Sequence, residues 1–209
     1  MRVDALVLDF GGVLVEIDFK RAFAAWAAAA GVSAAELASR FAFDDAYCAH
    51  ERGEIEAASY FAALRKTLGI ELADAELLAG WNSIFGAPLP GVEEALRSLS
   101  RELPLFVFSN TNKAHLAHFQ PRYRELLSHV KRTITSCDIG RRKPDPEAFL
   151  RMAGLTGLPP PRLAFFDDLE ENVAGARQAG LQAWRVSRPG EILDALARQR
   201  YLSSSAGGT

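Results

Sequence analysis

Apolar and polar residues follow two different periods along this chain of 209 residues. Apolar runs of strand length occupy Val3 to Phe10, Leu105 to Phe108, Leu163 to Phe166 and Leu181 to Val186. Segments with a helical period alternate with the last three runs: Val92 to Leu99 comes before the first of them, and further helical segments lie between them. Strands separated by helices are typical of βαβ units, so the pattern predicts an α/β fold with a doubly wound parallel sheet.

A long alanine-rich segment with a helical period follows the first strand and extends to about Phe85. Its turn and cap signals lie at Gly31 to Ser33, His50 to Gly53, and Gly69-Ile70, which predicts roughly four helices. We therefore expect a helical cap domain at residues 16–85, inserted into a core domain of residues 1–15 and 86–200. Residues 201–209 lack apolar periodicity and are expected to be a disordered tail.

Composition favours a small-molecule partner. Lys and Arg number 24 against 26 Asp and Glu, a net charge of −2, and no stretch is basic enough to follow a nucleic-acid backbone. Cys48 and Cys137 are too few for a disulfide framework. The run from Val3 to Phe10 is too short for a membrane span and lacks a cleavage site, so we expect a cytoplasmic protein without a membrane partner. The sequence does not indicate which oligomeric state the protein has.

Carboxylates end two of the predicted strands. Asp9 is followed by Gly11 and Gly12, which allow a tight turn close to a bound anion, whereas Asp167 and Asp168 follow the third apolar run. The carboxyl ends of parallel strands meet at one edge of a sheet, so these three acids are expected to converge and to hold Mg²⁺. An ordinary strand-ending turn and a solvated acidic helix start are the competing interpretations.

A polar segment also follows the second predicted strand. Ser109 and Asn110 precede a helix, so their hydroxyl and amide groups are expected near a helix N-terminus, where phosphate binds well. Ordinary N-capping by Ser, Thr or Asn explains the same residues equally well.

Lys143 precedes a helix that Asp145 caps and Pro146 begins. An ammonium fixed there can neutralise both an attacking carboxylate and a phosphoryl oxygen. We interpret the neighbouring Arg141 and Arg142 as solvated surface charges.

Two histidines, His115 and His118, stand one helical turn apart after the second strand. Their spacing suits a metal, but no third ligand lies nearby in sequence, so we expect partly buried helix residues instead.

The segments around Asp9, Ser109, Lys143 and Asp167, in this order and spacing, closely resemble the four motifs of the haloacid dehalogenase (HAD) superfamily. The resemblance spans nearly the whole chain and is to members with a helical cap inserted after the first motif. It implies a Rossmann-like HAD core. Further segments look like those of bacterial α-D-glucose-1-phosphate phosphatases: Val15 to Phe19, His50 to Ile55, Ser109 to Asn112, and Phe165 to Asp168.

The resemblance implies hydrolysis of a phosphomonoester through an aspartyl-phosphate. Asp9 would attack phosphorus, Ser109 and Lys143 would hold the phosphoryl oxygens, and Asn110 would add a substrate contact. Mg²⁺ would bridge Asp9 to Asp167 and Asp168, with the main-chain carbonyl of Gly11 as a further ligand. Such a mechanism agrees with the general chemistry of phosphoryl transfer, in which positioning and charge neutralisation dominate.

One position departs from the superfamily pattern. Most phosphatases of this kind carry a second Asp two residues after the nucleophile, as general acid and base, whereas this chain has Gly11. A general acid–base contributes roughly 10²–10⁴-fold, so the leaving group must be good or a cap residue must substitute. A sugar 1-phosphate has a comparatively good leaving group, and the glucose-1-phosphate phosphatases also have a small residue here.

Gly11 leaves rival functions open. A 2-haloacid dehalogenase needs no acid to protonate a halide, but it also needs no Mg²⁺, which argues against it. A non-catalytic phosphosugar-binding protein is a second alternative. A mutase is the least attractive, because it needs a second acid–base group.

Arg52 lies at a predicted turn of the cap. Its side chain either reaches the substrate or forms a surface ion pair with Glu51, Glu54 or Glu56, and both interpretations stay open.

Overall fold

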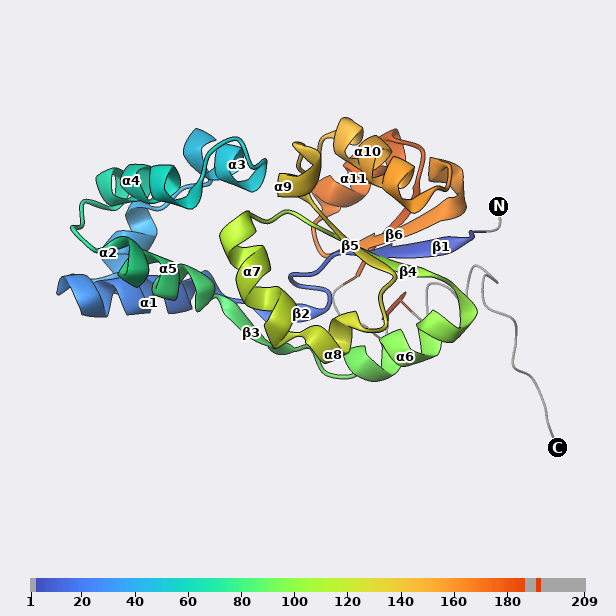
Figure 1. Cartoon of the computed structure of the whole chain (residues 1–209), viewed down its shortest axis with the longest axis horizontal. Coiled ribbons are helices and arrows are strands. Elements are labelled where there is room, and N and C mark those ends of the chain that lie inside the picture. The colour runs from blue at the N-terminus through green and yellow to red at the C-terminus, as the bar shows by residue number, and fades with distance from the viewer. Residues whose placement is uncertain (1–2, 187–190, 193–209) are drawn as a thin grey trace.

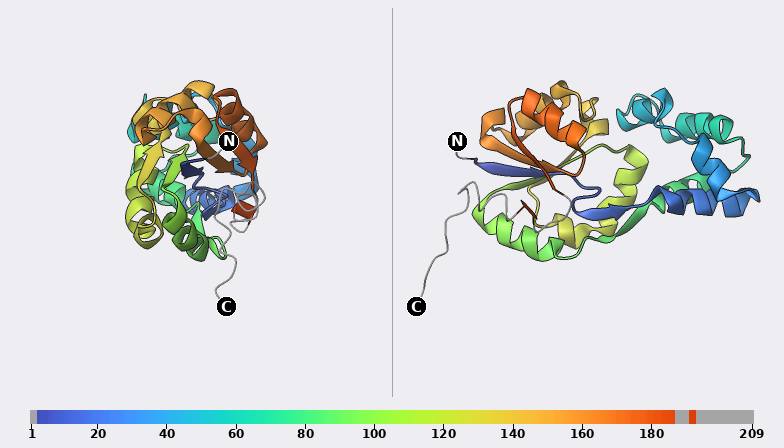
Figure 2. Two further views of the ribbon diagram at one scale, coloured as in Figure 1. Left: turned by 90° about the vertical axis from the view of Figure 1, so that its right-hand side faces the viewer. Right: turned by 180° about the vertical axis from the view of Figure 1, so that it is seen from behind.

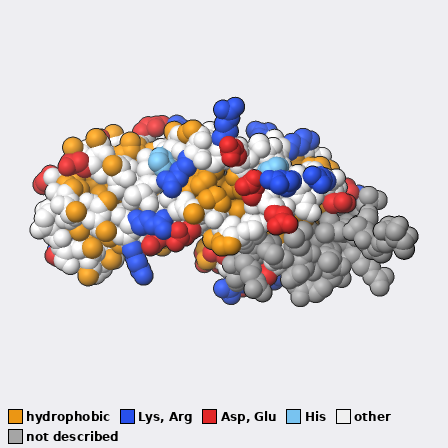
Figure 3. Space-filling model, turned by 90° about the horizontal axis from the view of Figure 1, so that it is seen from below, with side chains coloured by type: hydrophobic (Ala, Val, Ile, Leu, Met, Phe, Trp, Pro, Cys, Tyr) orange, Lys and Arg blue, Asp and Glu red, His pale blue; other side chains and the backbone are white. Residues whose placement is uncertain are grey.

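The computed structural model describes residues 3–186 and 191–192, so the expected tail at 201–209 lies outside the described residues. The described part consists of an α/β core and a block of helices beside it, which together make an elongated molecule (Figure 1). On the face seen in Figure 3, basic and acidic side chains are interspersed, and apolar side chains are exposed near the middle of the long axis.

The core is built on a parallel sheet in which β1 (Ala5–Leu8) is central. The strand order is β5-β4-β1-β6-β7, and all neighbouring strands are parallel. The other strands are β4 (Leu105–Ser109), β5 (Arg132–Thr135), β6 (Leu163–Asp167) and β7 (Gln182–Arg185). The chain winds from β1 to one edge and then to the other, which confirms the doubly wound sheet and sets a switch point at β1.

One strand of the parallel sheet was not predicted, and neither were the two strands of the antiparallel ribbon described below. The edge strand β5 has the sequence Arg-Thr-Ile-Thr, and only its second half is buried. It therefore lacks the continuous apolar run that identifies central strands, which are covered on both faces.

Helices cover both faces of the sheet (Figures 1 and 2). On one face lie α6 (Val92–Glu102), α7 (Lys113–Arg122) and α8 (Arg124–Leu127), and on the other α9 (Ser136–Ile139), α10 (Pro146–Thr156) and α11 (Glu170–Gln178). A short 3₁₀ turn, Pro160–Arg162, precedes β6. Side chains of each strand alternate between the two buried layers, so that Phe106 and Phe108 of β4 pack on the α10 side and Val107 packs on the opposite side.

The start of α10 follows the predicted capping pattern. Asp145 accepts a hydrogen bond from the backbone N–H of Glu147 at 2.9 Å, and Pro146 is the first helical residue. The helix continues past Leu150 to Thr156. Its N-terminus holds the preceding residue pair, Arg142 and Lys143, at the edge of the sheet.

The helical block contains five helices between residues 19 and 82, all of which are described, so the expected number of roughly four is too low. They are α1 (Phe19–Ala30), α2 (Ala34–Arg40), α3 (Asp45–Glu51), α4 (Ala57–Leu68) and α5 (Asp74–Asn82). The missed break lies between Phe41 and Asp44, which contains neither Gly nor Pro. There Asp44 caps α3 through the backbone N–H of Tyr47 at 2.8 Å.

An antiparallel ribbon connects the two parts. The strands β2 (Val15–Ile17) and β3 (Phe85–Pro88) pair through Val15 with Pro88 and Ile17 with Phe85. They carry the chain out of the core and back, and the expected domain boundaries fall within them. In the described residues no single helix has the length and hydropathy of a membrane span; α1 and α2 reach both only when joined, with a bend of 119° between them.

Two tryptophans form the centre of the helical block, which is called the cap from here on. The rings of Trp26 in α1 and Trp81 in α5 stack with centroids 5.8 Å apart, and Trp26 Nε1 donates to Leu77 O at 3.0 Å. A Cβ atom at Gly80 would collide with the indole of Trp26. Gly80 therefore permits the close approach of the two helices.

We predict that Gly80→Ala lowers the free energy of unfolding by about 1–3 kcal/mol, because the added methyl group overpacks the contact with Trp26. Gly154→Ala in α10 is the matched control, since its Cβ meets nothing within 4 Å. That change is expected to stabilise the protein by about 0.5–1 kcal/mol through helix propensity. Denaturant unfolding measures both, and a Gly80→Ala protein as stable as wild type contradicts the packing described.

Candidate active site

The predicted acids meet at the carboxyl edge of the sheet. Asp9 directly follows β1, and Asp167 is the last residue of the neighbouring strand β6. The backbone N–H of Asp9 donates to Phe166 O at 2.9 Å, which holds the two strand ends together. Ser109 ends β4 on the other side of β1. The three positions flank the switch point, where α/β sheets bind ligands.

A pocket of about 460 Å³ opens at this edge, between the core and the helical block. From the core it is lined by residues that include Asp9, Ser109 and Lys143, and from the cap by residues that include Phe43 and Glu51. Phe43 and Leu169 of the lining are large apolar residues with exposed fractions of 62% and 48%. The pocket therefore combines a polar floor with partly apolar walls.

Lys143 is the buried centre of the polar floor. Its ammonium lies 2.6 Å from Asp9 Oδ1 and 2.7 Å from Asp167 Oδ2, and it donates to Phe108 O at 3.0 Å. The side chain is 1% exposed, so all three donors of the ammonium are used inside the protein. Lys143 thus fixes the two carboxylates relative to each other and to β4.

Asn110 holds the main chain of Lys143. Its side-chain amide donates to Lys143 O at 2.9 Å, and its Oδ1 accepts from Lys143 N at 2.8 Å. Asn110 lines the pocket, but both polar atoms of its side chain already bond to backbone. Asn110 therefore supports the position of Lys143, and its contact with the substrate stays a prediction. Ser109 Oγ makes only a 3.5 Å contact with Asn110 O, which leaves the hydroxyl able to bond elsewhere.

The electrostatic environment changes the proton affinity of Asp9. Burial raises the pKa of Asp9, Lys143 lowers it and Asp167 raises it again, so that the pKa reaches about 7. Burial alone lowers the pKa of Lys143, but the charges of Asp167 and Asp9 outweigh it and raise the pKa. The lysine therefore stays charged between the two acids.

Asp9, Asp167 and Asp168 each offer a carboxylate oxygen, and these oxygens lie within 4.8 Å of one another. Three carboxylates against one ammonium leave two negative charges in a largely buried site. Burial and the nearby Asp167 raise the pKa of Asp168, which indicates charge that the protein itself does not compensate. Asp167 is held by Asn172 Nδ2 at 2.9 Å and by the backbone N–H of Leu169 at 2.9 Å. Such a set of hard oxygen donors fits a divalent cation such as Mg²⁺.

The two glycines after Asp9 have different steric roles. Gly12 has φ of 78°, and a Cβ atom there would collide with the carboxylate of Asp168. A Cβ at Gly11 would lie 2.8 Å from Ile17 Cγ1. Ile17 therefore occupies the space that a longer side chain at position 11 would need.

Arg52 is the candidate that the structure does not bring to the pocket. Its guanidinium pairs with Glu54 through two hydrogen bonds of 2.7 Å, the surface ion pair weighed in the sequence analysis. Arg142, interpreted as solvated charge, instead lines the pocket and pairs with Glu51 at 2.8 Å. Sequence patterns gave no signal for this pair, because the partners lie 91 residues apart.

The two histidines do not belong to the group of acids, although His115 lines the same pocket. His115 is 5% exposed, stacks on Trp81, and its Nε2 lies 3.2 Å from Trp81 O. Burial lowers its pKa to about 3. In the described part of the chain, the group of acids that could hold a metal includes neither His115 nor His118.

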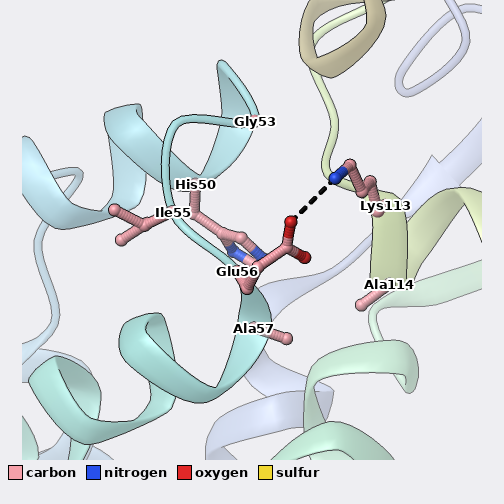
Figure 4. Close-up of a pocket in the computed structure, with 7 residues that line it drawn as sticks. All are labelled: His50, Gly53, Ile55, Glu56, Ala57, Lys113 and Ala114. Carbon is pink, nitrogen blue, oxygen red and sulfur yellow. Dashed lines mark hydrogen bonds and ion pairs between the residues drawn. The ribbon is translucent and has the colours of Figure 1, made fainter.

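A smaller pocket of about 230 Å³ lies beside the cap–core boundary (Figure 4). Glu56 of the cap and Lys113 at the start of α7 pair across it at 2.8 Å. Both side chains are more than half exposed, so water screens the pair and its contribution to stability is small. The larger pocket, with its buried charges, is the better candidate site.

Comparison with known proteins agrees with this geometry. Residues 3–180 match the family described as haloacid dehalogenase-like hydrolase. The chain belongs to this family. It is a hydrolase of the HAD superfamily, as the motif resemblance predicted.

Relatives of the family resemble the chain over most of its length. A Mycobacterium tuberculosis protein named as a phosphatase is 30% identical and matches 95% of this chain and 94% of its own. A D-ribitol-5-phosphate phosphatase from Bacteroides thetaiotaomicron is 23% identical, with coverage of 86% and 90%.

Solved structures of HAD proteins share the fold. A HAD family enzyme from Bacteroides thetaiotaomicron, in a magnesium complex, has a TM-score of 0.79 at 25% identity and covers 95% of this chain and 100% of its own. The L-2-haloacid dehalogenase from Xanthobacter autotrophicus has a TM-score of 0.67 at 20% identity, with coverage of 88% and 77%. The second likeness concerns the fold alone.

For this HAD protein we predict that Gly12→Ala weakens Mg²⁺ binding roughly 10–100-fold, because the new methyl group displaces Asp168. Gly91→Ala is the matched control: Gly91 has φ of 79°, but nothing lies within 4 Å of its Cβ position. Both variants carry the strain of a positive φ, and only the first disturbs the acids. Calorimetric titration with Mg²⁺ compares them, and equal affinities would exclude Asp168 from the metal site.

Proposed function

We propose that this protein is a Mg²⁺-dependent phosphatase that hydrolyses a small phosphomonoester, a sugar phosphate such as glucose 1-phosphate, through an aspartyl-phosphate on Asp9. The observation that carries the proposal is the contact of one buried ammonium, Lys143, with Asp9 and Asp167, beside a third acid, Asp168. Phosphoryl transfer needs positioned charge more than covalent chemistry, and this cluster supplies it.

In the proposed mechanism Asp9 is the nucleophile. One oxygen of Asp9 is held by Lys143, so the carboxylate is oriented and the other oxygen can attack phosphorus. Asp9, Asp167, Asp168 and the carbonyl of Gly11 would hold Mg²⁺, which when bound screens the negative charge of the phosphoryl group. Ser109 has a hydroxyl free to bind a phosphoryl oxygen, and Lys143 neutralises charge that develops at Asp9. As the bond from Asp9 to phosphorus forms, the ester P–O bond breaks and the alcohol leaves. Water then attacks phosphorus, breaks the bond to Asp9, and releases inorganic phosphate and the free carboxylate.

The raised pKa of Asp9 concerns the site without a bound cation. A divalent cation beside a carboxylate favours its ionised form and lowers its pKa. With a cation held by the three acids, Asp9 would be present in its ionised form, which is the form that attacks phosphorus.

The leaving group decides how much the absence of an acid at Gly11 matters. In a sugar 1-phosphate, the bond between phosphorus and the anomeric oxygen breaks, and the sugar departs more easily than a simple alkoxide. Relatives named as a phosphatase and as a D-ribitol-5-phosphate phosphatase support a phosphate ester of a small polyhydroxylated compound. A general acid from the cap would extend the range to poorer leaving groups.

The alternatives remain distinguishable. Gly11 is compatible with a 2-haloacid dehalogenase, but displacement of halide from carbon needs no cluster of three carboxylates. A phosphosugar-binding protein would bind the same compounds without releasing phosphate. Release of halide, or binding without turnover, identifies these two cases.

We predict that Asp9→Asn lowers phosphate release at least about 10³-fold, because the amide is a poor nucleophile. The measurement is phosphate release from a panel of sugar phosphates and p-nitrophenyl phosphate, with Mg²⁺ or with EDTA. Release by the wild type is expected only with Mg²⁺ and to be fastest on a sugar 1-phosphate.

Asp4→Asn is the matched control. Asp4 precedes the same strand β1 at its opposite end and forms an exposed ion pair with Arg162, whose loss has a small effect. Its activity should match that of the wild type. Equal activity of the Asp9→Asn protein would refute the proposed nucleophile.

A further inference from the structure

Glu51 is an unexpected residue in a pocket for phosphate esters. It belongs to α3 of the cap, is 5% exposed, and lines the same pocket as Asp9, Ser109 and Lys143. A carboxylate here would repel a phosphate dianion and loses hydration on burial. A buried charge of this kind requires compensation by the protein.

Arg142 and Tyr47 provide that compensation. Arg142 Nε donates to Glu51 Oε2 at 2.8 Å, and the hydroxyl of Tyr47 donates to Oε1 at 2.9 Å. Ser136 Oγ lies 2.7 Å from the main-chain oxygen of Glu51. Arg142 neutralises the negative charge, so that Glu51 presents hydrogen-bond acceptors to the pocket without a net repulsion of the phosphoryl group.

The acceptor capacity of Glu51 is not used up by these contacts. A carboxylate has about four lone-pair sites, and each oxygen of Glu51 accepts one side-chain hydrogen bond. The remaining sites can accept further hydrogen bonds, and hydroxyl groups of a ligand are suitable donors. Burial raises the pKa of Glu51 above its usual value, and Arg142 and Tyr47 offset only part of this rise.

The apolar walls fit the same kind of ligand. Phe19, Phe43 and Phe85 line the pocket together with Ile17. The rings of Phe19 and Phe43 meet edge to face at 5.5 Å, with Phe43 62% exposed. Aromatic walls pack against the carbon faces of a sugar or polyol while a carboxylate binds its hydroxyl edge.

We propose that Glu51 selects the leaving group, by accepting hydrogen bonds from the hydroxyl groups of a sugar or polyol whose phosphoryl group lies at Asp9. The inference rests on the proposed phosphatase function and adds a specificity-determining residue from the cap to it. Consecutive residues connect the two ends of the substrate: Lys143 contacts the nucleophile, and Arg142 contacts Glu51. The subsite exists only while α3 lies against the core, because Glu51 and Arg142 belong to different parts of the chain.

The test compares two substrates that share a six-membered ring, glucose 1-phosphate and cyclohexyl phosphate. Cyclohexyl phosphate has no hydroxyl groups for Glu51 to bind. For Glu51→Gln, the loss of kcat/KM on glucose 1-phosphate is expected to exceed the loss on cyclohexyl phosphate by roughly 10–100-fold. Any damage to Arg142 or Lys143 affects both substrates and cancels in this ratio. Ribitol 5-phosphate and its deoxygenated analogue pentyl phosphate form a second pair, which tests a linear polyol in place of the ring sugar.

Glu54→Gln is the control, because Glu54 lies on the same turn of the cap and pairs with the exposed Arg52. It should leave the substrate ratio unchanged. Tyr47→Phe keeps Glu51 but removes the donor that orients Oε1, so a smaller loss in the same direction is expected. This variant decides the question if Glu51→Gln fails to fold.

Three results separate the claims. A selective loss on the hydroxylated member of either pair supports the inference. Equal losses on both members of each pair overturn it and leave Glu51 as a structural partner of Arg142. Failure of the wild type to hydrolyse any of the four esters with Mg²⁺ overturns the proposed phosphatase function itself.

Discussion

The central constraint in this protein is the placement of one buried ammonium between two carboxylates. Lys143 is 1% exposed and contacts Asp9 and Asp167 at 2.6 and 2.7 Å. Removing one partner of such a buried pair leaves an uncompensated charge, at a cost of about 3–5 kcal/mol. The ends of β1 and β6 must therefore stay in position beside Lys143. The hydrogen bonds from Asn110 to the Lys143 backbone fix the lysine at this place. The cluster that fits a cation depends on this arrangement.

The same segment extends the constraint to the cap. Arg142 precedes Lys143 and pairs with Glu51, so one dipeptide contacts both Asp9 and a cap carboxylate. In the mechanism that we propose, the core supplies the chemistry and the cap supplies the specificity. Ile17, which fills the space beside Gly11, belongs to the ribbon that joins them. The space that the side chain of a general acid at position 11 would need is thus filled by Ile17 of the connecting ribbon.

The central sheet and the convergence of the acids were predictable because buried parallel strands are continuous apolar runs with their functional residues at the carboxyl ends. The edge strand β5 was not, since the exposed Arg132 and the half-buried Thr133 interrupt the apolar run. The break between α2 and α3 carries no Gly or Pro signal. The presence of Arg142 in the pocket, and of Arg52 in an ion pair with Glu54, could not be predicted. Both depend on which arginine the fold places beside Glu51. Long-range pairing of this kind leaves no local pattern in a single sequence.

The most direct test of the proposed mechanism is a search for the covalent aspartyl-phosphate. Wild-type protein is mixed with a phosphomonoester that it hydrolyses and Mg²⁺, quenched in acid within one turnover, and mapped by peptide mass spectrometry. We expect one phosphoryl group on Asp9 and none on the Asp9→Asn protein. Turnover with an unmodified Asp9, or with the phosphoryl group on another residue, would contradict the role of Asp9 as the nucleophile.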